Sequence, residues 1–178
     1  MRSSLGSLRS VPRDSLGSAG LRGFTLVELL VTISIVGILA TLAVPAFNEV
    51  MLGSKLTSLA NNFVASALLA RSEAIKRNAA VTLCASSDGS TCTGAWKDGW
   101  VVRAGGTVVY SQTKFPSGFV LSGNVTSISF QPTGVGATAA NLTLCRATPT
   151  IGSQQRTIQV SVTGRPDVAK VTGATTCP

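Results

Sequence analysis

Histidine is absent from the 178-residue sequence, and only seven acidic residues and one tyrosine are present. Without an imidazole the chain has no histidine base for a catalytic triad and no histidine metal ligand. The carboxylates form no close pair for acid–base chemistry beyond the isolated Asp88 and Asp98. Serine and threonine are plentiful, but none lies in a nucleophile elbow. We therefore predict that the protein is not an enzyme and has no metal or cofactor.

Charge is missing altogether from Leu29–Val44, and Glu28 is the one ionised residue between Phe24 and Phe47. As a helix, Phe24–Phe47 would be about 36 Å long, which exceeds the roughly 30 Å of a bilayer's hydrocarbon core. The run therefore predicts a transmembrane helix. Because a carboxylate inside such a helix costs free energy, Glu28 is a candidate functional residue.

Three other interpretations of the apolar run are a signal anchor, a secretory signal and a core helix. A plain signal anchor does not require an internal glutamate. A secretory signal would be cleaved after small residues, which Ala40–Ala43 supply. An ordinary core helix is rarely apolar on every side.

The segment GFTLVELLVTISIVGILATLAVPAF, which begins at Gly23, resembles the N-terminus of type IV prepilins and type II secretion pseudopilins. The resemblance implies that a membrane peptidase cleaves between Gly23 and Phe24 and methylates the new N-terminal Phe24. It also implies that Glu28 neutralises the terminal amine during assembly and that Pro45 kinks the helix. Thr25 matches the motif as well.

The resemblance divides the chain at Gly23. Residues 1–23 become a cleaved leader of net charge +3, and the remaining 155 residues carry +5 of the total of +8. Since basic residues precede the span, we expect the leader in the cytoplasm and the C-terminal domain in the periplasm. The protein would be a single-pass inner-membrane protein before it enters a filament. Such a leader is longer than is common in the family.

Four cysteines agree with an exported domain, because they lack the spacing of zinc sites and their number is even. Three disulfide pairings are possible. We favour the sequential one, Cys84–Cys92 with Cys145–Cys177.

The order of elements predicts an α+β fold in which a long N-terminal helix packs on an antiparallel β-sheet domain. Residues 24–47 form its membrane half and residues 48–78 an amphipathic half, with Leu52, Leu56, Leu59 and Phe63 on one face. Residues 79–178 form a β-rich domain with a basic C-terminal tail. The predicted strands are Val81–Ala85, Trp100–Arg103, Thr107–Tyr110, Val120–Leu121, Ile128–Phe130, Leu142–Arg146 and Thr157–Val162.

Further motifs narrow the resemblance to the FimT and GspH branch of minor pilins and pseudopilins. They are ARSEAIKRN at Ala70–Asn78, WKDGW at Trp96–Trp100, FQPTG at Phe130–Gly134 and the late segment Arg156–Arg165. The resemblance implies a minor pilin of a type IV pilus, with a minor pseudopilin of a type II secretion system as the alternative. Implied partners are other pilin subunits, the prepilin peptidase and methyltransferase, and the inner membrane.

Binding of double-stranded DNA is a second hypothesis, because basic residues outnumber acidic ones six to one from Gly99 onward. Members of the FimT branch capture DNA through a Gly-Arg-any-Arg motif in the C-terminal tail. Here Gly164 and Arg165 match it, but Asp167 stands where the second arginine belongs. The candidate DNA-binding residues are Arg146, Arg156, Arg165 and Lys170.

Overall fold

The structure is a computed structural model, and it describes residues 23–148 and 151–178. The predicted leader, except for Gly23, lies outside these residues. A long helix comes first, and the strands follow it. The elements are α1 (Leu26–Arg77), β1 (Val81–Ala85), the 3-10 helix η1 (Trp96–Asp98), β2 (Trp100–Ala104), β3 (Thr107–Gln112), β4 (Phe119–Gly123), β5 (Ser127–Phe130), β6 (Ala140–Arg146), β7 (Gln154–Val160) and β8 (Pro166–Thr172).

The helix α1 has a defined signal at each end. At its start Thr25 is the N-cap, and its Oγ1 accepts a hydrogen bond from the Glu28 amide at 3.2 Å. At its end Asn78 adopts a left-handed φ of 48°, and the Ala79 amide donates to the Ala74 carbonyl at 3.2 Å. Asparagine tolerates this conformation better than most residues, so it ends the helix at Arg77.

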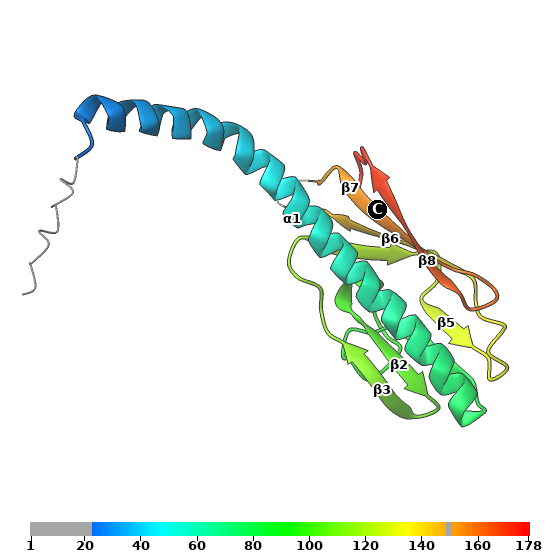
Figure 1. Cartoon of the computed structure of the whole chain (residues 1–178). Helices are drawn as coiled ribbons and strands as arrows, with labels where there is room; N and C mark the ends of the chain where they lie inside the picture. Colours follow the sequence, from blue (N-terminus) through cyan, green and yellow to red (C-terminus); the bar gives the residue numbers. More distant parts are fainter. Residues whose placement is uncertain (1–22, 149–150) are drawn as a thin grey trace, which may run out of the picture. The chain divides into compact units, whose positions relative to one another are not determined.

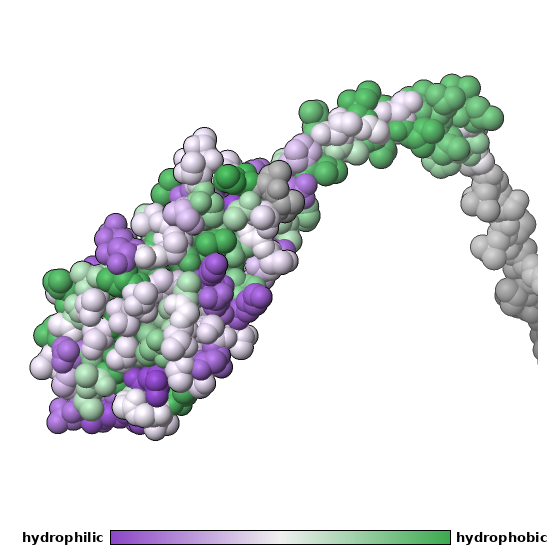
Figure 2. Space-filling model, turned by 180° about the vertical axis from the view of Figure 1, so that it is seen from behind, coloured by the Kyte–Doolittle hydropathy of each residue, from purple (hydrophilic) through white to green (hydrophobic). Residues whose placement is uncertain are grey.

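The first part of α1, up to Ala43, is exposed along its whole length. Its apolar side chains appear as the green run of Figure 2. By length and composition α1 is the one helix of the described residues that could cross a membrane. Apolar side chains exposed in this number need a non-aqueous environment or a partner surface.

The second part of α1 buries one face against the strands. Its buried residues recur every three or four positions, as an amphipathic helix requires. Phe63 lies at the centre and contacts Trp96 and Trp100 edge to face, with ring centroids 5.5 and 5.4 Å apart. The buried positions are Leu52, Leu56, Ala60, Phe63, Ser66, Ala67, Ala70, Glu73 and Ala74.

Two antiparallel four-stranded sheets form the rest of the domain, in the orders β3-β2-β1-β5 and β4-β6-β7-β8. Figure 1 shows their strands along one side of the C-terminal half of α1. Strand β7 meets the helix near Thr57, and β2 meets it near Ser66. Inward-facing residues alternate along the strands. Together with the buried face of α1 they form one hydrophobic core.

The structure confirms the predicted α+β fold. All seven predicted strands are present; β1 has its predicted bounds, and the ends of the others differ by at most three residues. At the C-terminus one predicted strand has the wrong bounds, and one strand was not predicted. The late strand runs over Gln154–Val160 rather than Thr157–Val162, because Ser161–Arg165 forms a turn. The predicted basic tail contains the additional strand β8, which the sequence did not reveal because most of its residues are exposed.

Candidate functional site

The assembly motif lies at the start of α1. Phe24 is 78% exposed, and the Glu28 side chain is exposed in the first helical turn. The amide of Glu28 is occupied by the Thr25 hydroxyl, so a helical start is built into the motif itself. A negative side chain is favourable there because the helix dipole is positive at this end. Cleavage and methylation at Gly23 and Phe24, and the assembly role of Glu28, stay predictions.

Pro45 lies inside α1, and the helix continues through it from Leu26 to Arg77. A proline has no amide hydrogen, so Pro45 cannot donate to the carbonyl of Thr41 one turn earlier. The Thr41 hydroxyl donates to the Ile38 carbonyl at 2.7 Å, a bond of the same turn that does not replace the missing one. The predicted role of Pro45 as a kink in assembly stays a prediction.

Both cysteine pairs of the favoured pairing are disulfides in the structure. Cys84 joins Cys92 with Cα atoms 5.4 Å apart, and Cys145 joins Cys177 at 5.8 Å. The second disulfide returns the C-terminus to the sheet, where the Ala174 amide donates to the Ser153 carbonyl at 3.1 Å. The chain that follows the edge strand β8 is thereby held against the sheet.

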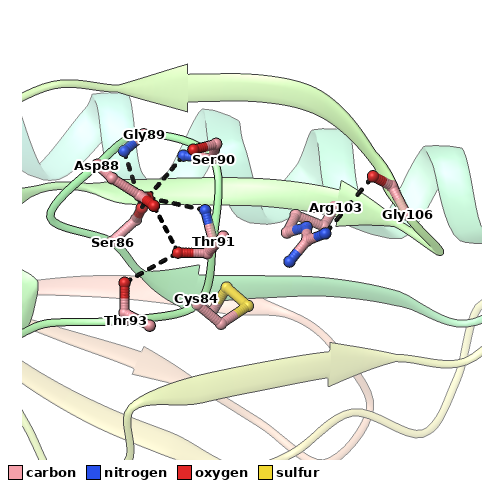
Figure 3. Close-up of a disulfide and its surroundings, with 10 residues drawn as sticks. Cys84, Ser86, Asp88, Gly89, Ser90, Thr91, Thr93, Arg103 and Gly106 are labelled. Carbon is pink, nitrogen blue, oxygen red and sulfur yellow. Dashed lines mark hydrogen bonds between the residues drawn. A yellow bond between two sulfur atoms is a disulfide. The ribbon is translucent and has the colours of Figure 1, made fainter.

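The loop closed by Cys84–Cys92 is organised by one carboxylate, that of Asp88 (Figure 3). Asp88 accepts hydrogen bonds from the hydroxyls of Thr91 and Ser86 at 2.6 and 3.0 Å. It also accepts from the amides of Thr91 and Ser90 at 2.8 and 2.9 Å. These donors, with the Thr91 hydroxyl first, hold the pKa of Asp88 well below its ordinary value. Because four donors bond to the Asp88 carboxylate, we interpret it as a residue that holds the loop in its conformation.

Arg156, one of the four predicted DNA-binding residues, is buried, with 6% of its surface exposed. Its Nη2 donates to the Gly53 carbonyl at 3.1 Å and to the Thr57 Oγ1 at 3.0 Å. Its Nη1 donates to the Gln155 carbonyl at 3.0 Å. Burial lowers the pKa of Arg156 from its ordinary value, although arginine stays charged. This residue joins β7 to α1 and also lines the polar hollow beside the helix, so its role as a phosphate contact stays a prediction.

The other three predicted residues do not share a surface. Lys170 is the cross-strand partner of Arg156 and lines a polar hollow of about 750 Å³ beside α1. Arg165 lies in the β7–β8 turn, about 17 Å along the strand from Lys170. Arg146 ends β6 and lines a different hollow. The Gly164–Arg165 pair forms the turn itself, with Gly164 at a φ of 76°.

The hollow at Arg146 contains a cation that the sequence analysis did not single out, Lys55 of α1. The available signal was its position as the first basic residue after the apolar run. Among the described residues no cluster of three potential metal-ligating side chains occurs. The described surfaces carry polar and cationic hollows.

A long N-terminal helix whose second part packs on an antiparallel β domain, preceded by a glycine-phenylalanine junction, defines a pilin-like subunit. Two solved structures share the fold. Both are crystal structures of the type IV minor pilin FimU of Pseudomonas aeruginosa strain PAO1, in space groups P65 and P21. The first has 21% identity, a TM-score of 0.51 and covers 64% of this chain and 92% of its own. The second has 20% identity, a TM-score of 0.53 and covers 65% and 89%.

Two family models match the sequence. The model described as "Type II transport protein GspH" matches residues 59–164, and the "Prokaryotic N-terminal methylation motif" matches residues 21–44. The chain belongs to the GspH family of minor pilins and pseudopilins. This confirms the family resemblance, and the members of the family are structural subunits. No curated protein matches the chain.

Proposed function

We propose that the protein is a minor pilin of a type IV pilus, which helps to initiate assembly of the filament. The observation that carries the proposal is the continuity of α1. The helix begins at Leu26, inside the match to the methylation motif at residues 21–44. It continues without a break to Arg77, inside the match to the GspH model at residues 59–164. One continuous helix can thus lie in the membrane at its apolar end and carry the domain at the other.

In this proposal prepilin peptidase removes residues 1–23 and Phe24 becomes the methylated N-terminus. Residues 24–47 anchor the subunit in the inner membrane, residues 48–78 hold the domain, and residues 79–178 form the periplasmic part. In the membrane, the terminal ammonium and the Glu28 carboxylate both lie at a low-dielectric boundary, where unpaired charge is costly. Pairing Glu28 with an amine lowers this cost and sets the register between subunits.

A minor pseudopilin of a type II secretion system is the second candidate function. The match to the family model of the type II transport protein GspH favours it, whereas the shared fold with FimU favours the pilus. Both functions use the same processing and the same helix. They differ in which machine requires the subunit.

The test is deletion of the gene in the source organism, followed by two measurements on the same strain. Loss of surface pili with normal protein secretion supports the minor pilin. Loss of exoprotein secretion with normal pili supports the pseudopilin instead. A strain that keeps both contradicts the proposed role in either filament. Complementation with the unaltered gene is the control for polar effects.

Capture of double-stranded DNA is not part of the proposed function. Arg156 and Lys170 line one polar hollow beside α1, whereas Arg165 and Arg146 line two other hollows. Phosphate binding by charge alone still predicts weak, salt-sensitive affinity for DNA. A salt titration with the full chain and an Arg165→Ala, Lys170→Ala variant tests whether the two exposed cations contribute together.

A further inference from the structure

A cationic hollow of about 500 Å³ lies between the first turns of the packed part of α1 and the ends of β4 and β6. Two cations line it from different elements, Lys55 from the helix and Arg146 from β6. Residues with uncharged donors also line it, namely Asn48 with its amide and Ser117 and Thr148 with their hydroxyls. None of the described residues that line the hollow is acidic.

Carboxylates do not neutralise the two cations within the part of the chain that the structure describes. The ion pairs found there join Glu73 to Lys76 and to Arg77. Arg146 donates through its Nε to the Thr148 carbonyl at 3.2 Å, which orients the guanidinium and leaves its terminal nitrogens available as donors. Two like charges that face one hollow repel each other, and an anion placed between them removes that repulsion.

Glu49 is the carboxylate nearest to this level of the helix, and it lies on another face. Six positions separate it from Lys55, which corresponds to about 240° around the helix axis. Its Oε2 accepts from the Ser153 hydroxyl at 3.0 Å and from the Gln154 amide at 3.2 Å. Glu49 is therefore occupied on the β7 side and does not compete for the hollow.

The position of the hollow along the helix indicates its ligand. The apolar run ends at Phe47, and Phe47, Val50 and Met51 are 64%, 68% and 44% exposed. Lys55 follows Phe47 by eight residues, or about 12 Å along the axis. Helical side chains point back toward the N-terminus, and a lysine reaches roughly 6 Å in that direction. Its ammonium then lies about 6 Å beyond the apolar run, within a headgroup layer that is about 5–7 Å thick.

We propose that this hollow binds the phosphate of an anionic phospholipid, with Lys55 and Arg146 as the cationic contacts and Asn48, Ser117 and Thr148 as further donors. The bound lipid holds the domain against the membrane surface before the subunit enters a filament. A guanidinium and an ammonium together match a phosphate better than a single point charge does. The inference rests on the proposed function only in placing Phe24–Phe47 in a bilayer.

The test uses the full chain in nanodiscs that contain four parts phosphatidylcholine to one part phosphatidylglycerol. Native mass spectrometry after release from the nanodisc counts the lipids that stay bound. We expect the parent protein to retain phosphatidylglycerol in excess over its share of the bilayer. Each cation near an anionic surface is worth about fivefold in affinity, so a Lys55→Gln, Arg146→Gln variant should lose about 10- to 30-fold of this preference.

A matched control removes the same charges elsewhere, as Lys114→Gln with Arg165→Gln, two exposed residues outside the hollow. Equal loss of preference in this control, or no preference in the parent, overturns the proposal. The single variant Lys55→Gln removes no described internal hydrogen bond, so we expect it to fold. It can therefore replace the double variant in the test if the double variant unfolds.

A second arm separates the lipid from free phosphate. Inorganic phosphate is titrated against the parent protein in nanodiscs of phosphatidylcholine alone. Saturable binding that Lys55→Gln removes, without a preference for phosphatidylglycerol, identifies a site for soluble anions and overturns the lipid proposal. The readout needs membrane insertion and no filament, so its failure is distinct from a failure of the minor-pilin function.

Discussion

Arg156 on β7 and Thr57 on α1 are joined by two hydrogen bonds, from Nε at 3.3 Å and from Nη2 at 3.0 Å to the Thr57 Oγ1. The same guanidinium reaches the Gly53 carbonyl one turn earlier. A charged donor thereby satisfies a helix carbonyl and a side chain in a contact that water hardly reaches. The pair fixes the position of the second sheet along the helix.

Replacement of Arg156 by alanine should destabilise the domain. Hydrogen bonds to a charged donor contribute about 1.5–3 kcal/mol net, so we expect a loss of about 2–3 kcal/mol in the free energy of unfolding. Urea unfolding of the detergent-solubilised protein, followed by tryptophan fluorescence, measures it. The control Arg165→Ala changes an exposed arginine and should stay within about 0.5 kcal/mol. Equal effects of the two variants would contradict the structural role of Arg156.

Ser66→Ala should destabilise the core although alanine favours helices. The Ser66 hydroxyl accepts from the Trp100 indole at 2.8 Å, and Trp100 is fully buried. Its loss leaves a buried donor unpaired, which costs about 1–3 kcal/mol. Ser72→Ala is the matched control, because the Ser72 hydroxyl bonds only to the Leu69 carbonyl of its own helix and is exposed. Thermal unfolding of the two variants should differ in sign or clearly in size.

Acid should weaken the disulfide loop through Asp88. Its pKa is lowered in the folded state, so its contribution to stability is fully present above its unfolded pKa of about 3.9 and is lost as the pH falls through the folded value. The melting temperature of the parent should therefore fall more steeply below about pH 4 than that of Asp88→Asn.

Glu73 acts in the same direction, because its hydrogen bond from Arg77 lowers the pKa of its carboxyl. A Glu73→Gln variant separates this contribution from that of Asp88. If the melting temperatures of the parent and Asp88→Asn fell in parallel with pH, the Asp88 hydrogen bonds would not contribute to the stability of the fold.

The two disulfides should contribute unequally. They close loops with sequence separations of 8 and 32 residues. In the chain-entropy account these loops are worth about 2.6 and 3.7 kcal/mol. Urea unfolding should therefore show a smaller loss of stability for the Cys84→Ser, Cys92→Ser double variant. The loss should be larger for the Cys145→Ser, Cys177→Ser double variant. A larger loss for the shorter loop would show that the Asp88 network depends on its disulfide.

Glu28→Ala should leave the protein processed and membrane-bound but exclude it from filaments. An unpaired amine at a low-dielectric boundary costs several kcal/mol, so incorporation should fall at least about tenfold. Immunoblots of sheared filaments and membranes measure the two pools. Glu49→Ala is the control, since that carboxylate contacts Ser153 and Gln154 of the domain. Normal incorporation of Glu28→Ala would refute the assembly role.

The long helix and the first strands follow from local pattern. The apolar run and the amphipathic repeat that follows it act over short spacings, so they predict a helix over residues 24–78, within two positions of the observed α1. Strand β1 has the predicted bounds Val81–Ala85 because its alternation is flanked by polar loops. Strand β8 lacks this signal. As an exposed edge it is defined by pairing with β7 and by the tail disulfide, both of which join distant residues.

By itself, the sequence determined the membrane-length helix, the methylation motif, the family and the pairing order of the cysteines. Each of these properties resides in residue type and short spacing, which folding does not alter. Only the tertiary structure decided what the cations do. Arg156 became a buried contact between sheet and helix, while Arg146 met Lys55, 91 positions away in the chain, at one hollow. Charge counts are sums over a sequence, whereas binding depends on which charges share a surface, and that is set by strand register and helix packing.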